Sequence, residues 1–299
     1  MAIPPDPFQE RPSTYVVQDR SNPQELRRLQ LQDHLITLTL GGVLPEQPEP
    51  ERFTYVLDVA CGAGGWLIEL AKTVPTISHL VGVDISRHMV ELARADAEAQ
   101  QVQERIEFRV MDALQLCDLS DDTFSLVNMR FAVSFLRTWE WSRVLLELQR
   151  VAQPGGIIRL TEADLPDQSS SPALLRLFHL LAQAYSQAGK YFHVPANGIA
   201  DSLAELLGQQ KLQNIQTRIY RPEIKGNTEA GQLFFEDAKY LFRTNIPFLQ
   251  KWIHMPDDYE DLYQQMLVEM RQPGFTVSNL TITAWGSKPL KDAWSSAPL

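Results

Sequence analysis

The stretch 54–65, TYVLDVACGAGG, constrains the fold of this chain more than any other. Its first half is a short apolar run rich in β-branched residues, which is typical of a buried strand. Its second half contains Gly62 and Gly64, which have no side chain, and an apolar helical segment follows at 66–70. A strand that ends in a glycine turn before a helix lets the backbone approach a bound molecule and points free helix N–H groups toward it. We therefore expect a ligand site at this turn.

Alternating strand and helix patterns continue on both sides of the turn. We predict strands at 54–60, 79–84, 105–111, 123–129 and 156–163, with helices at 65–73, 87–101 and 139–152. Strands that alternate with helices imply right-handed crossovers and a parallel sheet. Because the strands are continuous apolar runs, both faces of this sheet should be covered. The pattern indicates an α/β fold with a doubly wound sheet.

The regular alternation stops near residue 164. Helices are predicted at 23–40, 172–188, 196–208, 228–250 and 257–271, and further strands at 214–224 and 275–285. We divide the chain into an N-terminal arm and lid helix, a core and a C-terminal part, at 1–50, 51–164 and 165–299. Helices outside the regular sheet often cover its carboxyl edge. We therefore expect a helical lid built from about 1–45, 165–210 and 227–271.

Charge and cysteine content limit the classes of partner. The net charge is −10, which argues against nucleic acid or an anionic membrane surface as the main partner. No run approaches the length of a membrane span, and the N-terminus lacks the apolar core of a signal peptide. Two cysteines make no disulfide framework and have no metal-ligand spacing, so we expect a reducing, cytoplasmic setting and no metal site. A homodimer is left open.

Three acidic residues follow the order of the first three strands. Asp58 lies within the first strand, Asp84 ends the second, and Asp112 follows the third. Because the carboxyl ends of parallel strands meet at one edge of a sheet, these carboxylates should converge on the crevice where open α/β sheets bind ligands.

With its neighbours, this pattern resembles the class I S-adenosylmethionine-dependent methyltransferases. The resemblance rests on five motifs in the family's order: VLDVACGAGG at 56–65, LVGVDIS at 80–86, RVMDALQL at 109–116, DDTFSLVNMRF at 121–131 and RVAQPGGIIRLTE at 150–162. Ala60 stands where the family usually has its first glycine. The resemblance implies a Rossmann-like sheet, mostly parallel with an antiparallel last strand, and S-adenosylmethionine as cofactor, with S-adenosylhomocysteine as product.

The chemistry of this cofactor suits the residues. Asp84 can accept hydrogen bonds from both ribose hydroxyls, and Asp112 from the adenine amine. Backbone carbonyls near Ala60, or Asp58 through water, suit the ammonium of the methionine end, and Arg130 suits its carboxylate. The complete set of candidate cofactor-binding residues is Asp58, Ala60, Gly62, Gly64, Asp84, Ile85, Met89, Met111, Asp112, Ala113 and Arg130. For Met89 and Arg130 a core residue and a solvated arginine, respectively, are equally good interpretations.

An oxygen or nitrogen acceptor that must lose a proton needs a base, whereas an activated carbon does not. The preferred candidates are Glu162, at the end of the fifth strand, and His193, in the expected lid. Further candidates are Asp164, His34, His179, Tyr185 and Tyr191. Cys61 lacks a neighbouring base, so we interpret it as a small residue that fits the turn.

The substrate class follows from what the chain has and lacks. After the fourth strand, at 128–131, the two prolines typical of methyltransferases that act on exocyclic or amide nitrogen are missing. The C-terminal part is rich in aromatic residues, which suits a small apolar or aromatic metabolite. We predict methyl transfer to such an acceptor. The alternatives are a non-catalytic S-adenosylmethionine-binding module and a nicotinamide-dependent oxidoreductase; the missing third glycine opposes the oxidoreductase.

Overall fold

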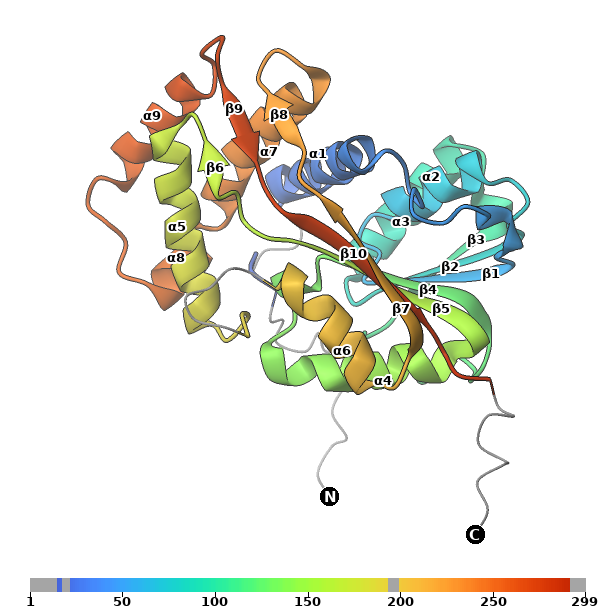
Figure 1. Ribbon diagram of the computed structural model, residues 1–299. Coiled ribbons are helices and arrows are strands. Elements are labelled where there is room, and N and C mark those ends of the chain that lie inside the picture. The colour runs from blue at the N-terminus through green and yellow to red at the C-terminus, as the bar shows by residue number, and fades with distance from the viewer. Residues whose placement is uncertain (1–14, 18–21, 193–198, 291–299) are drawn as a thin grey trace, which may run out of the picture.

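The computed structural model describes residues 15–17, 22–192 and 199–290 (Figure 1). A seven-stranded sheet forms its centre, in the order β3-β2-β1-β4-β5-β10-β7. Its strands are β1 (Tyr55–Val59), β2 (His79–Asp84), β3 (Ile106–Val110), β4 (Phe124–Arg130), β5 (Ala152–Ala163), β7 (Gln213–Tyr220) and β10 (Thr281–Ser287). The first five are parallel, and β10 is antiparallel to both of its neighbours. The predicted α/β fold, with a mostly parallel doubly wound sheet and an antiparallel last strand, is confirmed.

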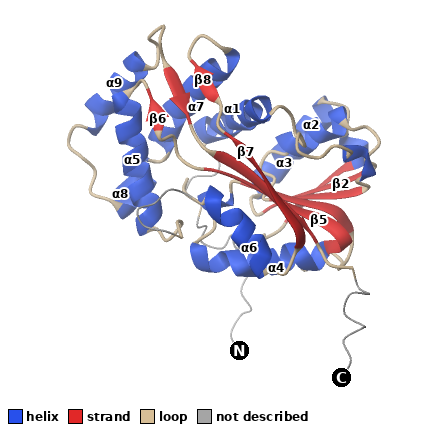
Figure 2. Cartoon of the chain, viewed as in Figure 1, coloured by secondary structure: helices blue, strands red, loops and turns tan. Residues whose placement is uncertain are grey.

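Helices cover both faces of this sheet (Figure 2). One face packs against α2 (Gly65–Thr73) and α3 (Arg87–Ala99), the other against α4 (Trp141–Val151) and α6 (Leu203–Gln209). Successive strand residues point to opposite faces. Val56 accordingly packs in the cluster that contains Trp66, whereas its neighbour Leu57 packs with Trp141. Both residues are fully buried although they point to opposite faces of the sheet. A strand covered on both faces therefore needs apolar residues at consecutive positions.

A helical lid lies beyond the carboxyl ends of the parallel strands (Figure 1). It contains α1 (Pro23–Leu40), α5 (Pro172–Gln187), α7 (Glu229–Thr244), α8 (Ile246–Trp252) and α9 (Tyr259–Glu269). A second sheet, in the order β6-β9-β8, joins β6 (Gln168–Ser169), β9 (Thr276–Ser278) and β8 (Glu223–Lys225). Helix α1 packs along α7, so the N-terminal and C-terminal parts of the lid form one layer.

Short 3-10 turns connect several of these elements. They are η1 (Pro50–Arg52), η2 (Gln103–Arg105), η3 (Ala132–Ser134), η4 (Thr138–Glu140) and η5 (Ala200–Ser202).

Three predicted elements are divided in the structure. The strand predicted at 214–224 is β7 and β8, separated at Pro222, which has no backbone N–H for a sheet. The strand predicted at 275–285 is β9 and β10, which pair in different sheets. The helix predicted at 228–250 ends at Thr244, because Pro247 starts a new helix and cannot continue the old one. Of the helix predicted at 196–208, the described part begins with the η5 turn and continues as α6.

Candidate functional site

The turn after β1 holds its shape through unusual backbone angles. Ala60, Gly62 and Gly64 have φ values of 58°, 54° and 78°, in the left-handed region that favours glycine. The Gly62 N–H donates to Asp84 Oδ2 at 3.0 Å, so the second strand fixes the turn of the first. A Cβ on Gly62 would meet no atom within 4 Å, which leaves open space beside the turn.

Gly64 serves packing. A Cβ there would lie 2.6 Å from the ring of Phe108, and Gly64 does not line the cavity described below. Its place among the candidate cofactor-binding residues therefore has no support from this geometry. The absence of a side chain lets the turn rest on β3, which brings the ends of the strands together.

A large cavity of about 980 Å³ opens at the carboxyl ends of the strands, beneath the lid. Ten of the candidate cofactor-binding residues line it: Asp58, Ala60, Gly62, Asp84, Ile85, Met89, Met111, Asp112, Ala113 and Arg130. The three carboxylates thus lie around one cavity, as the parallel strand order requires.

Two of these carboxylates are held by the backbone that follows them. Asp84 Oδ1 accepts from the Ser86 N–H at 2.8 Å, and Asp112 Oδ1 accepts from the Leu114 N–H at 2.9 Å. A carboxylate offers about four lone-pair positions, so each can accept further hydrogen bonds from a ligand. The contacts orient both groups in advance, which lowers the entropy cost of binding.

The third carboxylate, Asp58, begins a buried polar chain that crosses the sheet. Asn128 Nδ2 donates to Asp58 Oδ1 at 2.7 Å, Arg159 Nη1 donates to Asn128 Oδ1 at 2.7 Å, and Arg159 Nε donates to Glu46 Oε1 at 2.7 Å. Burial raises the pKa of Asp58 to about 7, although Arg130 and the Asn128 hydrogen bond oppose the shift. Sequence reasoning missed this chain, because Glu46 lies among Pro45, Pro48 and Pro50 in a segment without a recognisable motif.

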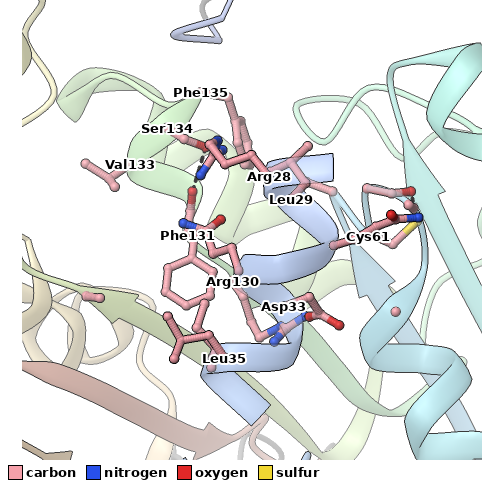
Figure 3. A pocket seen from close by; sticks show the side chains of 18 of the residues that line it. Arg28, Leu29, Asp33, Leu35, Cys61, Arg130, Phe131, Val133, Ser134 and Phe135 are labelled. Carbon is pink, nitrogen blue, oxygen red and sulfur yellow. Dashed lines mark hydrogen bonds and ion pairs between the residues drawn. The ribbon is translucent and has the colours of Figure 1, made fainter. Parts of the chain in front are cut away.

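Arg130 is held by a residue that the sequence did not suggest (Figure 3). Its Nη2 donates to Asp33 Oδ1 at 2.6 Å, and Asp33 belongs to lid helix α1. The guanidinium also lies over the rings of Trp66 and Phe131, at 5.8 and 5.9 Å from their centroids. The interpretation of Arg130 as a solvated arginine is wrong, since its side chain is only 13% exposed.

The far end of the cavity lies among aromatic residues of the lid. Those that line it are Tyr15, Phe178, Tyr185, Tyr191 and Phe234. Tyr185 packs edge-on against Tyr191, with centroids 5.6 Å apart. Burial raises the pKa of both phenols well above its usual range, so neither is a base near neutral pH.

A buried ionic cluster fastens α1 to α7 beside this aromatic wall. Arg28 donates from Nε and Nη2 to the two carboxylate oxygens of Glu25, both at 2.8 Å, and from Nη1 to Asp237 Oδ1 at 3.2 Å. Tyr15 and Thr244 donate to Glu25 as well, at 2.7 and 3.0 Å. Burial raises the pKa of Asp237 to about 6, and Arg28 opposes that shift. The cluster gives a mainly apolar wall one charged region.

The candidate base Glu162 is buried beside the cavity. Its Oε1 accepts from the Val133 N–H at 3.2 Å, and its Oε2 has no hydrogen-bond partner within the described residues. Burial raises its pKa to about 8. Glu162 does not itself line the cavity, although its neighbours Ala163 and Asp164 do.

The other candidate bases lie in varied places. Asp164 lines the cavity and accepts from the Ile199 and Ala200 N–H groups, at 3.0 and 3.1 Å, while burial raises its pKa to about 6. His34 also lines the cavity, at an exposed position of α1 where its Nε2 lies 3.2 Å from Glu229 Oε1. His179 is not among the residues that line the cavity. His193 lies outside the described residues.

Two features remain at this site: the thiol of Cys61 and the arrangement of residues that could bind a metal ion. Burial raises the pKa of the Cys61 thiol well above its usual range, which opposes a nucleophilic role. Within the described part of the chain, no group of three or more His, Cys, Asp or Glu side chains could hold a metal ion. Nor is any helix in 15–17, 22–192 or 199–290 long and apolar enough to cross a bilayer.

Comparison with known proteins points to one kind of domain. Residues 56–156 match the family model described as a methyltransferase domain. The demethylmenaquinone methyltransferase of Lactiplantibacillus plantarum is 36% identical over 114 residues, which are 38% of this chain and 47% of the relative. That of Deinococcus radiodurans is 35% identical over 160 residues, covering 52% of this chain and 64% of the relative.

Two more comparisons extend this result. The ubiquinone/menaquinone biosynthesis C-methyltransferase UbiE of Geobacter sulfurreducens is 29% identical, over 55% of this chain and 63% of the relative. The chain thus spans about half to two thirds of the length of these curated relatives. A crystal structure of a Bacillus halodurans C-125 protein superposes with a TM-score of 0.50 at 18% identity, over 79% of this chain and 92% of that one, and shows the shared fold.

The open turn, the carboxylates at the strand ends and the matched segment all coincide in residues 56–156. The chain therefore carries a methyltransferase domain at residues 56–156.

Proposed function

We propose that this protein is an enzyme that transfers the methyl group of S-adenosylmethionine to a small apolar or aromatic acceptor beneath the lid. One observation carries the proposal: a single cavity of about 980 Å³ runs from the carboxylates at the strand ends to an aromatic wall of the lid. The cofactor end and the acceptor end are thus parts of one continuous cavity. The names of the curated relatives, demethylmenaquinone methyltransferases, support an aromatic acceptor.

The residues of the cavity fit the cofactor. Asp84 is placed to accept from the ribose hydroxyls, and Asp112 from the adenine amine, since both carboxylates line the cavity and are already oriented. Gly62 leaves room for the adenosyl group beside the turn. When bound, S-adenosylmethionine supplies the methyl group from its sulfonium sulfur, which is left as a neutral thioether when the acceptor takes the methyl group by in-line displacement.

The protein's contribution to this step is position and exclusion of water. Positive charge disperses as the displacement proceeds, so a dry pocket that holds both reactants in line accelerates it. The lid supplies apolar and aromatic walls through Phe178, Tyr185 and Phe234. For a hydroxyl or ring-carbon acceptor that must lose a proton, we propose Asp164, which lines the cavity, as the base, and Glu162, which lies behind the cavity wall, as the second candidate. His193 remains a proposed lid residue.

Calorimetry and a turnover assay test this function. The wild type should bind S-adenosylmethionine and S-adenosylhomocysteine but not reduced nicotinamide cofactor. Asp84→Ala should weaken binding by about tenfold or more, the size of charged hydrogen bonds. Glu107→Ala, which removes an exposed carboxylate from neighbouring β3, is the matched control and should bind as the wild type does.

The acceptor is tested with chemically reduced 1,4-naphthoquinones and simpler phenols, with product methylation read by mass spectrometry. Methylation of a member of this panel supports the proposal. Cofactor binding without turnover of any acceptor would favour the non-catalytic binding module, and no binding at all would refute both. The net charge of −10 supports a small molecule, rather than nucleic acid, as the partner.

A further inference from the structure

One lid side chain reaches the cofactor end of the cavity. Asp33 extends from α1 to Arg130 (Figure 3). Its Oδ2 lies so close to the backbone of Gly65 that a Cβ on this glycine would collide with it. Gly65 is the first residue of α2, the helix that starts at the glycine turn. The lid therefore places a carboxylate directly at the turn, and the side chain is 27% exposed.

The charges at this end of the cavity favour a positive ligand group. Asp33 and Asp58 both line the cavity, and the charge of Asp33 is one of the causes that raise the pKa of Asp58. A cation placed near two carboxylates of one cavity is attracted to both of them. The ammonium of an amino acid is such a cation.

Arg130 retains hydrogen-bonding capacity beside this pair. A guanidinium has five N–H donors, and the hydrogen bond that Arg130 donates within the described residues comes from Nη2 alone. It can therefore bind a second carboxylate without releasing Asp33. The ion pair offers one charge of each sign to a ligand that also carries one of each.

We infer that Asp33 and Arg130 together bind the amino-acid end of S-adenosylmethionine, with Asp33 accepting from its ammonium and Arg130 donating to its carboxylate. The inference rests on the proposed function. Asp33 lies outside the segment 56–156 that matches the methyltransferase domain, so the cofactor site includes a residue of the lid. Binding of the cofactor then ties α1 to the core and helps to complete the acceptor pocket.

Three ligands separate the two charges in a calorimetric titration of the full chain. S-adenosylmethionine carries both groups, decarboxylated S-adenosylmethionine keeps only the ammonium, and methylthioadenosine has neither. Asp33→Asn should weaken binding of the first two by about 10- to 100-fold and leave methylthioadenosine unchanged. Arg130→Met should weaken only S-adenosylmethionine. Asp258→Asn, which removes a similar ion pair with Arg176 on the surface, is the control and should change no affinity.

Each outcome distinguishes this inference from the proposed function. If the wild type binds none of the three ligands, the proposed function fails and the inference with it. If it binds them but Asp33→Asn has unchanged or tighter affinity for S-adenosylmethionine, only the inference is overturned. Equal weakening for all three ligands also overturns it, because Asp33 would then only support the lid. Asp33→Ser, tested in parallel, provides a second variant, and methylthioadenosine binding verifies that each variant is folded.

Discussion

Replacing Glu162 with glutamine should change how the stability of this protein depends on pH. Glu162 is 1% exposed, and burial raises its pKa from 4.5 to about 8. The folded state holds the Glu162 proton more tightly than the unfolded state does. The contribution of this group to the free energy of unfolding is therefore fully present below about pH 4.5 and is lost as pH rises through about 8. Each pKa unit corresponds to about 1.4 kcal/mol. Between about pH 5 and pH 9 the wild type should therefore lose roughly 4 kcal/mol that Glu162→Gln keeps.

Urea unfolding at a series of pH values measures this difference. The amide can accept from the Val133 N–H as the carboxyl does, so the substitution preserves the contact. Asp58 and Asp164 titrate in both proteins, and subtraction of the two curves removes most of their effect. Glu205→Gln, at an exposed position of α6, should follow the wild type. Parallel curves for wild type and Glu162→Gln would refute the claim that a buried, protonated Glu162 is part of the folded state.

Two further predictions concern the turn and the polar chain across the sheet. Gly64→Ala should cost about 2–4 kcal/mol of unfolding free energy, since a left-handed backbone and contact with Phe108 both oppose a Cβ. Gly62→Ala, where a Cβ meets no atom, should cost about 1 kcal/mol, and equal melting shifts for the two would contradict this reasoning. Arg159→Met should cost about 3–5 kcal/mol, because it leaves the buried Glu46 carboxylate unpaired. Adding Glu46→Gln should restore much of that loss in the same denaturation assay, and no recovery would show that the ion pair is not the cause.

Local sequence patterns predict the core of this protein well. The strand, turn and helix at 54–73 can be predicted from local sequence alone. The apolar strand pattern, the glycines of the turn and the start of the helix all indicate the same structure. The positions of Asp58, Asp84 and Asp112 follow from the order of parallel strands, which chain topology fixes once the strands are recognised. This is why much of the cofactor end of the cavity could be anticipated.

Residues that meet only through the tertiary fold could not be anticipated. Asp33 reaches Arg130 across 97 sequence positions, and Glu46 reaches Arg159 across 113. Neither acid carries a spacing or motif that distinguishes it from a surface carboxylate. The division of long predicted strands into β7 with β8 and β9 with β10 likewise depends on pairing with distant segments.

The small sheet gives the lid a particular mechanical attachment. Each strand of the small sheet is continuous with a strand of the central sheet: β6 follows β5, β8 follows β7, and β9 precedes β10. Three peptide segments therefore connect this part of the lid to the core, at 164–167, 221–222 and 279–280. Bending at one of these segments alone would shear the hydrogen bonds of the small sheet, whereas coordinated bending at all three preserves them. Any movement of the small sheet relative to the core therefore has to be shared among segments that lie far apart in the chain.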